Sequence, residues 1–223
     1  MESTIEKELE CQAKKLEISI KEEQIVLLKK FQKITQKTNC QFNLVSRKGN
    51  QEDLILNQIL DSLLLQPILR IAGPKKVLDL GSGGGFPGVP LSILNPDIHF
   101  DFLDSSRKRF NHLLNIKMKL GLTNSNPIHE RAENHAKTPQ HRAFYDLITA
   151  KAVTDISTLV KWARPLIKSN GILLTSQGES KTDEIWELMK DEGRQKGIQI
   201  RSLDGGLGGK RRNRLIWMRV GAV

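Results

Sequence analysis

The segment from Lys75 to Leu94, KKVLDLGSGGGFPGVPLSIL, places five glycines within eight positions, directly after a short apolar run. A turn this rich in glycine lets the backbone approach a bound ligand closely, because no Cβ atoms stand in the way. Gly83, Gly85 and Gly88 satisfy the pattern G-x-G-x-x-G, which is weak evidence when it stands alone. The segment therefore predicts a ligand-binding loop between a strand and a helix.

Two aspartates help to distinguish between the ligands that bind such loops. Asp79 stands two residues before Gly81, at the end of the predicted first strand. A carboxylate is unfavourable beside a pyrophosphate, which binds to backbone N–H groups and a helix N-terminus, whereas it suits the cationic amino group of S-adenosylmethionine (SAM). Asp104 ends the second predicted strand, about 20 residues beyond the loop, where an acid accepts hydrogen bonds from ribose hydroxyls. SAM is the favoured cofactor, and a nicotinamide dinucleotide is the less favoured alternative.

These residues need a sheet to position them, and the rest of the chain has the pattern of one. Apolar residues at helical spacing occur through the first 66 residues, and strands alternate with helices from residue 75 onward. Alternation of this kind is typical of a parallel sheet covered on both faces. The predicted strands are 76–80, 99–103, 127–131, 145–150, 171–176, 198–202 and 214–220, and the clearest predicted helices are 105–120, 155–168 and 182–196.

The connection between the last two predicted strands, LDGGLGGKRRN, is too rich in glycine and basic residues to form a helix. We therefore expect the last strand to return antiparallel. The predicted fold is α/β, with a Rossmann-like seven-stranded sheet in a SAM-binding domain at residues 67–223. A helical extension at residues 1–66 precedes it.

The composition bounds the class of protein. A chain of 223 residues suits one α/β domain with a modest extension. Cys11 and Cys40 are too few for a disulfide framework, and neither they nor the five histidines have metal-ligand spacing. No apolar run approaches the roughly 20 residues that cross a membrane, and the first residues are charged throughout. We expect a cytoplasmic protein without a metal ion and without a membrane partner.

The net charge of +10 is concentrated in two parts of the chain, 67–143 and 198–223. Positive patches of this kind favour contact with a polyanion. Ligands of open α/β sheets bind outside the carboxyl ends of the parallel strands, and both basic parts are predicted to open on that edge. We expect one basic rim that contacts RNA phosphates, because a solvated hairpin tip would explain the second cluster alone and not the convergence of both. Its predicted residues are Arg107, Lys108, Arg109, Lys210, Arg211, Arg212 and Arg214.

Five segments of the chain are similar to one known family. They are FNLV (42–45), ILDSLL (59–64), LDLGSGGGFPGVPLSI (78–93), FLDSSRKRFNHL (102–113) and YDLITAKA (145–152). From about Phe42 to Val220 the chain resembles the RsmG (GidB) family, bacterial methyltransferases that modify a guanine N7 in 16S ribosomal RNA. The glycine-rich segment followed by FPGVPL is considerably more specific than a generic SAM loop.

The resemblance implies a class I SAM-dependent methyltransferase that acts on the small ribosomal subunit, and we expect a monomer. By the same resemblance, Gly81, Phe86, Ala132, Glu133 and Lys151 would contact SAM, and Asp104 its ribose. Asp79 and Gly83 complete the predicted cofactor-binding residues. Because N7 of guanine carries a lone pair and no proton, we expect catalysis by positioning, without a general acid or base.

The chain departs from the family pattern at four positions. Asn57 and Gln58 stand where the family usually has Arg-His, Lys151 replaces an arginine, and Gln177 replaces a common lysine. Three of these four changes remove a group that is or can be positive. They keep two alternatives open: a non-catalytic RNA-binding protein with a vestigial SAM fold, and a SAM methyltransferase with a protein or small-molecule substrate.

Overall fold

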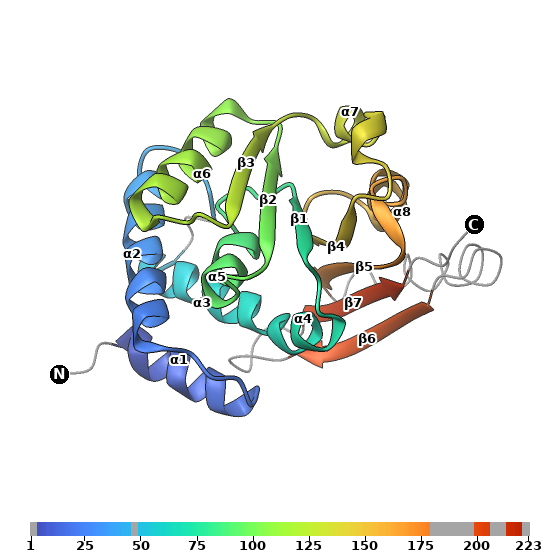
Figure 1. The fold of residues 1–223 in the computed structure, drawn as a ribbon. Coiled ribbons are helices and arrows are strands. Elements are labelled where there is room, and N and C mark those ends of the chain that lie inside the picture. The colour runs from blue at the N-terminus through green and yellow to red at the C-terminus, as the bar shows by residue number, and fades with distance from the viewer. Residues whose placement is uncertain (1–3, 46–48, 179–198, 206–212, 220–223) are drawn as a thin grey trace.

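The computed structural model of the protein describes residues 4–45, 49–178, 199–205 and 213–219. Four helices come first: α1 (Thr4–Lys15), α2 (Glu22–Asn39), α3 (Gln51–Leu63) and α4 (Gln66–Ala72). Strands and helices then alternate (Figure 1). The elements are β1 (Lys76–Leu80), α5 (Gly88–Leu94), β2 (His99–Asp104), α6 (Arg107–Leu120), β3 (Ser125–His129), α7 (Ala132–His135), η1 (Pro139–His141), β4 (Tyr145–Lys151), α8 (Ile156–Ala163), β5 (Ile167–Gly178), β6 (Gln199–Gly205) and β7 (Asn213–Arg219).

The strands of the described residues form one sheet in the order β3-β2-β1-β4-β5-β7-β6. Strands β1 to β5 pair in parallel, whereas β7 pairs antiparallel with both β5 and β6. The chain order reverses beside β1, which has β2 on one side and β4 on the other. Ligands of open α/β sheets bind at such a switch point, outside the carboxyl ends of the strands. The loop after β1 lies there.

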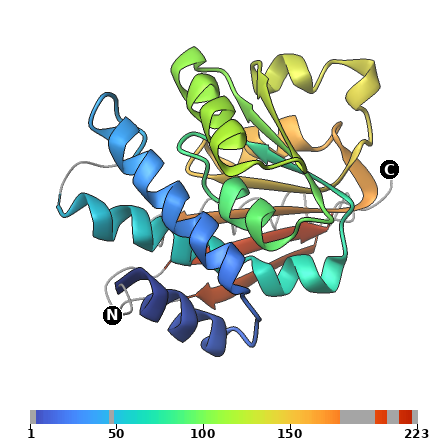
Figure 2. The ribbon, with the colours of Figure 1, turned by 60° about the vertical axis from the view of Figure 1, so that its left-hand side comes forward.

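Helices cover the two faces of the sheet in two hydrophobic clusters (Figures 1 and 2). On one face, α1, α2, α3, α5 and α6 share a cluster with the sheet, in which Phe31 and Ile59 from the first helices lie with Phe100 and Phe102 of β2. On the other face, α8 packs against strand residues such as Ile148. Because the first helices share their core with the sheet, the division of the chain at residues 66 and 67 stays a prediction.

One helical stretch in the described part of the chain, Gln51–Ala72, is long and apolar enough to cross a membrane by length and composition. The sequence-based expectation concerned only uninterrupted apolar runs, and this stretch is interrupted by polar and charged residues. Its apolar residues Ile55, Ile59, Leu63 and Leu69 are buried in the core cluster of the sheet. Core helices of this kind pass the same test, so the stretch is weak evidence for a membrane partner.

Several element boundaries differ from those predicted. Strand β3 begins and ends two residues earlier than expected, and its Pro127 is tolerated because β3 is an edge strand. Helix α8 ends at Ala163, short of the predicted residue 168, because Pro165 disfavours helical geometry in the residue before it. The predicted helix 182–196 lies outside the described residues.

Candidate active site

The glycine loop after β1 has a backbone that L residues rarely adopt. The φ angles of Gly81, Gly83 and Gly85 are +74°, +58° and +93°. A Cβ atom on Gly81 would lie 2.6 Å from the side chain of Val153, and one on Gly85 would lie 2.8 Å from Val89. At Gly83, the nearest atom would be the carbonyl oxygen of Gly81, at 3.7 Å. The loop is therefore packed against the protein at Gly81 and Gly85 and open at Gly83.

Asp79 lies beneath this loop and is fully buried. One carboxylate oxygen accepts a hydrogen bond from the Thr149 hydroxyl (2.8 Å), and the other accepts one from the Gly88 N–H (3.1 Å). Burial raises the pKa of Asp79 to about 6. These hydrogen bonds hold the loop and the first residue of α5 on the sheet. Contact of this carboxylate with the amino group of SAM, directly or through a water, stays a prediction, although none of its surface is exposed in this structure.

Asp104 joins the same loop to the next helix. One oxygen accepts from the Gly83 N–H (2.9 Å), and the other accepts from the Ser106 N–H (2.8 Å) at the start of α6. The Arg109 guanidinium lies 3.8 Å from the first of these oxygens. A carboxylate has about four lone-pair sites, so Asp104, with 4% of its surface exposed, retains acceptor capacity for ribose hydroxyls. The expected proximity of the second strand's acid to the loop is present in the structure.

Lys151 ends β4 on the other side of the loop. Thr149 lies opposite Asp79 in the parallel register, so Lys151, two residues further along, is level with Gly81. Its ammonium lies 3.0 Å from a carboxylate oxygen of Asp61 on α3. Both side chains are partly buried, with 17% and 21% of their surface exposed. Asp61 lies within the ILDSLL segment, and its sequence context alone indicated no role for it.

The other predicted cofactor residues differ in their surroundings. The side chain of Phe86 is buried and packs on Phe31, with ring centroids 5.1 Å apart, so its ring belongs to the core rather than to an open surface. Ala132 and Glu133 begin α7, beyond the carboxyl end of β3, and are partly exposed. They lie on the β3 side of the sheet, as a contact with the adenine would require.

Comparisons with known proteins identify the family. The sequence profile of GidB, rRNA small subunit methyltransferase G, matches residues 24–208. The Ribosomal RNA small subunit methyltransferase G of Desulforamulus reducens is 35% identical over 178 residues, which cover 80% of this chain and 74% of that protein. The protein of the same name from Actinobacillus succinogenes is 32% identical over 188 residues, which cover 84% and 85%. The chain belongs to the rRNA small subunit methyltransferase G family.

Solved structures support the fold of this family member. A putative O-methyltransferase from Klebsiella pneumoniae has a TM-score of 0.64 at 14% identity, covering 88% of this chain and 90% of that chain. The O-methyltransferase TomG from Streptomyces achromogenes, in complex with SAM, has a TM-score of 0.64 at 13% identity, covering 86% and 90%. The fold is that of a class I SAM-dependent methyltransferase.

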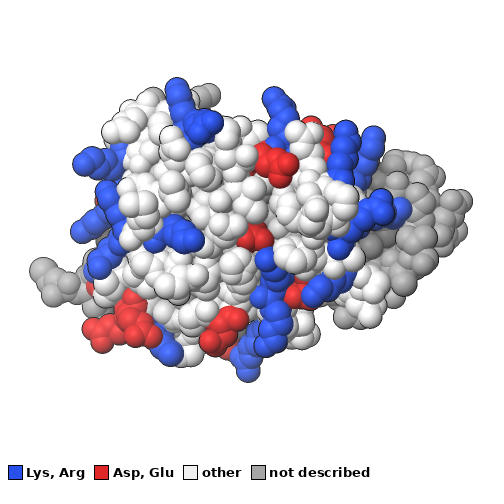
Figure 3. Space-filling view, turned by 45° about the horizontal axis from the view of Figure 1, so that its top comes forward, with Lys and Arg blue, Asp and Glu red and all other residues white. Residues whose placement is uncertain are grey.

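The first basic cluster of this methyltransferase lies at the carboxyl edge of the sheet. Arg107, Lys108 and Arg109 are all exposed in the first turn of α6. Figure 3, in which the top of Figure 1 comes forward, shows Lys and Arg side chains at both sides, the top and the lower centre of this face, with a few Asp and Glu side chains among the other residues between them. Cations in a helix's first turn oppose its dipole, so a negatively charged partner would stabilise them there.

The second basic cluster lies largely outside the described residues, which do not include Lys210, Arg211 or Arg212. The backbone of Arg214 lies in β7, opposite Gln177 near the carboxyl end of β5. The antiparallel direction of β7 therefore brings Arg214 to the same edge as the start of α6. Convergence of the two clusters on one RNA stays a prediction.

One group of side chains has the distances of a metal site. The ligand atoms of Glu130, His135 and His141 lie within 4.8 Å of one another. However, both ring nitrogens of His135 already have partners, the Glu130 carboxylate at 2.8 Å and the Tyr145 hydroxyl at 3.1 Å. The rings of His135 and His141 stack, with centroids 3.8 Å apart, so their in-plane lone pairs do not converge. We assign this group to packing at the edge of α7.

Proposed function

We propose that this protein transfers the methyl group of SAM to the N7 of a guanine in 16S rRNA of the small ribosomal subunit. The observation that carries the proposal is the glycine loop, open at Gly83 and hydrogen-bonded to Asp104, in a chain of this family. The switch point of the sheet is where a nucleoside is expected to bind in this class of fold. Membership of the family supplies the substrate.

The described residues fit the cofactor. The space at Gly83 admits a ligand's methionine end, and the spare acceptor capacity of Asp104 suits ribose hydroxyls. The Lys151 ammonium, level with Gly81, suits a carboxylate. When bound, SAM supplies an electrophilic methyl group on a positively charged sulfur. We therefore assign Gly83, Asp104 and Lys151 to cofactor binding, with Ala132 and Glu133 on the adenine side.

The protein's task in this reaction is positioning. N7 of guanine has an in-plane lone pair and no proton, so no side chain has to remove one. Two of the buried ionisable groups near the loop, Asp79 and His112, fit the role of an acid or base poorly. Asp79 has both oxygens hydrogen-bonded within the protein, and burial lowers the pKa of His112 to about 4, which keeps it neutral at pH 7. Holding the base in line with the methyl group and excluding water would supply the rate.

The RNA is held by charge. The first basic cluster borders the site, because Arg109 contacts Asp104. The side chains of Arg107, Lys108 and Arg109 are exposed and can contact phosphates. Arg214 and its basic neighbours in sequence are proposed to extend the same rim. Contact with phosphates and recognition of shape are the expected mode for such a surface.

The test uses purified protein, SAM labelled on its methyl group, and small ribosomal subunits from cells that lack the protein. Nuclease digestion and mass spectrometry of the 16S rRNA should find the label in N7-methylguanine. Label in protein or small molecules but not in rRNA would support a methyltransferase of another substrate. Absence of SAM binding in the micromolar range by calorimetry would support the non-catalytic RNA-binding alternative.

A further inference from the structure

The salt bridge between Asp61 and Lys151 stands out among the ion pairs of the protein because of its place. It joins α3 to the carboxyl end of β4, level with the glycine loop, where residue 153 packs on Gly81. Its members lie 90 residues apart in the sequence. A pair needed only to fasten α3 to the sheet could lie anywhere along the shared core, yet this one lies at the ligand-binding edge and keeps part of its surface exposed.

Asp61 has unused acceptor capacity at this edge. Within the described part of the chain, the only hydrogen-bond partner of its carboxylate is Lys151, which contacts the oxygen Oδ2. The other oxygen, Oδ1, has no partner among those residues, and an ionised carboxylate has about four lone-pair sites in all. The contact with the Lys151 ammonium, at 3.0 Å, holds the carboxylate in place. Asp61 is thus a held, partly exposed acceptor at the ligand-binding edge of the sheet.

We propose that Asp61 accepts hydrogen bonds from the N1–H and N2–H₂ groups of the target guanine and so selects guanine over other bases. This inference rests on the proposed function. Guanine alone among the RNA bases presents two adjacent donors on its Watson–Crick edge, and a carboxylate is their complement. Adenine and cytosine place an acceptor beside a donor there, and uracil places its one donor between two acceptors. A base taken out of its stack is read on this edge.

The geometry of the purine favours this mode of recognition. N7 lies across the ring system from N1 and N2, so a base held by Asp61 leaves its N7 free to face the cofactor. Methylation gives the guanine ring a positive charge, which makes N1–H a stronger donor. A contact between N1–H and a carboxylate therefore strengthens as the reaction proceeds, and interactions that strengthen in the transition state raise kcat.

The test compares two synthetic fragments of 16S rRNA, which differ only in guanosine or inosine at the methylated position. Inosine lacks the N2 amino group and keeps N1–H and N7. For the wild-type protein, kcat/KM should fall about 10- to 100-fold with inosine, the usual effect of losing one hydrogen bond to a charged group. The inosine fragment should also bind more weakly, with a higher Kd than the guanosine fragment. Asp61→Asn should lower kcat on guanosine. Its kcat/KM and its Kd should each be nearly equal for the two fragments.

Asp146→Asn is the matched control, because Asp146 is also paired with a lysine, Lys168 at 2.7 Å, but at the amino end of β4. It should keep the wild-type preference for guanosine. Lys151→Met should lower the rate and retain part of the preference, since Asp61 remains.

Three outcomes would overturn the proposal. In the first, the wild-type protein has the same kcat/KM for the inosine and guanosine fragments. This measurement does not depend on the folding of any variant. In the second, Asp61→Asn keeps the full preference, so Asp61 acts only by holding Lys151. In the third, Asp61→Asn weakens SAM binding by calorimetry with the preference unchanged, so Asp61 contacts the cofactor. A wild-type protein that methylates neither RNA nor intact subunits would instead refute the proposed function itself.

Discussion

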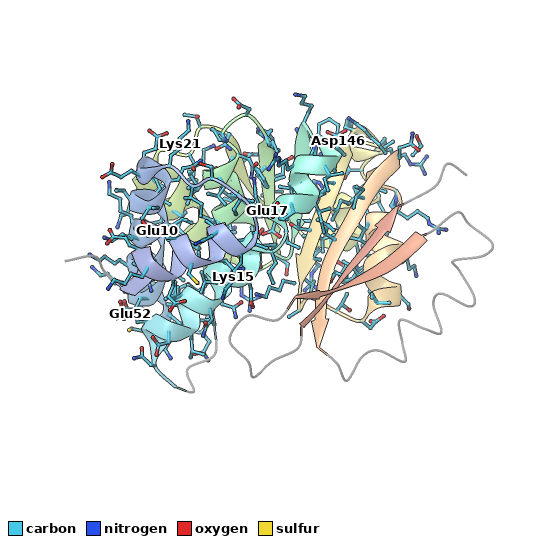
Figure 4. The ribbon with its side chains drawn as sticks, turned by 90° about the horizontal axis from the view of Figure 1, so that it is seen from below. Glu10, Lys15, Glu17, Lys21, Glu52 and Asp146 are labelled. Carbon is cyan, nitrogen blue, oxygen red and sulfur yellow. The ribbon has the colours of Figure 1, made fainter. Side chains whose placement is uncertain are left out.

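The two ends of β4 carry the same kinds of side chain arranged for different purposes. At the amino end, seen from below in Figure 4, Asp146 accepts hydrogen bonds from the N–H groups of Lys75 (2.9 Å) and Lys76 (2.8 Å) and from the Lys168 ammonium (2.7 Å). At the carboxyl end, the carboxylate of Asp61 has Lys151 as its only partner among the described residues. The carboxylate of Asp146 accepts three hydrogen bonds from the protein, whereas that of Asp61 accepts one from the described residues.

The same difference separates the two edges of the sheet. Gly121, which ends α6 at the amino edge, has a positive φ of +65° and only closes a helix. Gly83, with a φ of +58° at the carboxyl edge, leaves open space beside an acid. The amino edge therefore stabilises the fold, and the carboxyl edge leaves acceptors and space for a ligand. The comparison predicts that matched substitutions at the two edges will have different effects.

The largest expected effect follows Gly83→Val. The isopropyl group fills the space that the methionine end of SAM needs, so SAM binding measured by calorimetry should be lost. Gly121→Val is the control, because it imposes the same strain at a similar φ where a Cβ meets nothing within 4 Å. Both variants should lose on the order of 1–3 kcal/mol of stability. Equal SAM affinity in the two variants would move the cofactor site elsewhere.

A second contrast lies in pH dependence. Burial raises the pKa of Asp79 from 3.8 to about 6, so the folded protein holds this proton more tightly than the unfolded chain. The resulting stability is fully present below about pH 3.8 and is lost as the pH rises through 6, by at most about 3 kcal/mol. Urea unfolding of wild type and Asp79→Asn between pH 3.5 and roughly pH 7 should show this loss in wild type alone.

The contribution of Asp146 to stability should depend on pH in the opposite direction. Burial favours its neutral form, but hydrogen bonds from Lys168, Lys76 and Lys75 outweigh this and lower its pKa. Its contribution is therefore present above the ordinary pKa of an aspartate and is lost as the pH falls. In the same urea series, Asp146→Asn should destabilise the protein most near neutral pH. If the free energies of unfolding of Asp79→Asn and Asp146→Asn changed with pH in the same way, the difference between the two edges of the sheet would be contradicted.

A smaller effect on the cofactor is expected for Asp104→Ala. Loss of charge-assisted hydrogen bonds to the ribose should weaken SAM by roughly 1–3 kcal/mol, again by calorimetry. Because Asp104 also holds the N–H groups of Gly83 and Ser106, the variant should lose stability as well. Asp146→Ala should lose comparable stability and bind SAM normally, which separates the two effects.

The smallest effect concerns RNA and compares the two ends of α6. Neutralising Arg107 and Arg109 should weaken RNA binding and flatten the log–log dependence of affinity on salt, by about 0.7 for each lost contact with a single-stranded phosphate. Neutralising Lys117 and Lys119, in the last turn of the same helix, should leave the slope unchanged. If both double variants had the same salt dependence of RNA affinity, the proposed basic rim would be contradicted.

The second basic cluster has its own test. Neutralising Arg211 and Arg212 together should flatten the salt dependence in the same way and leave SAM affinity unchanged. A slope equal to that of wild type would mean that this part of the chain does not meet the RNA.

Sequence reasoning succeeded where local pattern decides structure. Glycine spacing after an apolar run gave the loop, and the position of an acid at the end of the next strand gave the proximity of Asp104 to Gly83. The alternation of elements gave the layers of the fold. Boundaries were less certain where one residue decides them, as with Pro165 after α8 and Pro127 in the edge strand.

It failed where partners come from distant parts of the chain. Whether Asp79 faces a ligand or the core depends on Thr149 and Gly88, and nothing near Asp79 in sequence indicates that both will donate to it. The ring of Phe86 is buried because Phe31 of α2 packs against it. Asp61 and Lys151 meet only after α3 has packed on the sheet. Family resemblance gave Lys151 a role but no partner.

The most direct test of the central claim is a map of N7-methylguanine in 16S rRNA by mass spectrometry, from cells with and without this protein. One guanine should lose its N7 methyl group when the gene is deleted. The wild-type gene should restore the methyl group and Gly83→Val should not. An rRNA map that is the same with and without the protein would contradict the proposed function, and a map that Gly83→Val restores in full would contradict the proposed cofactor site.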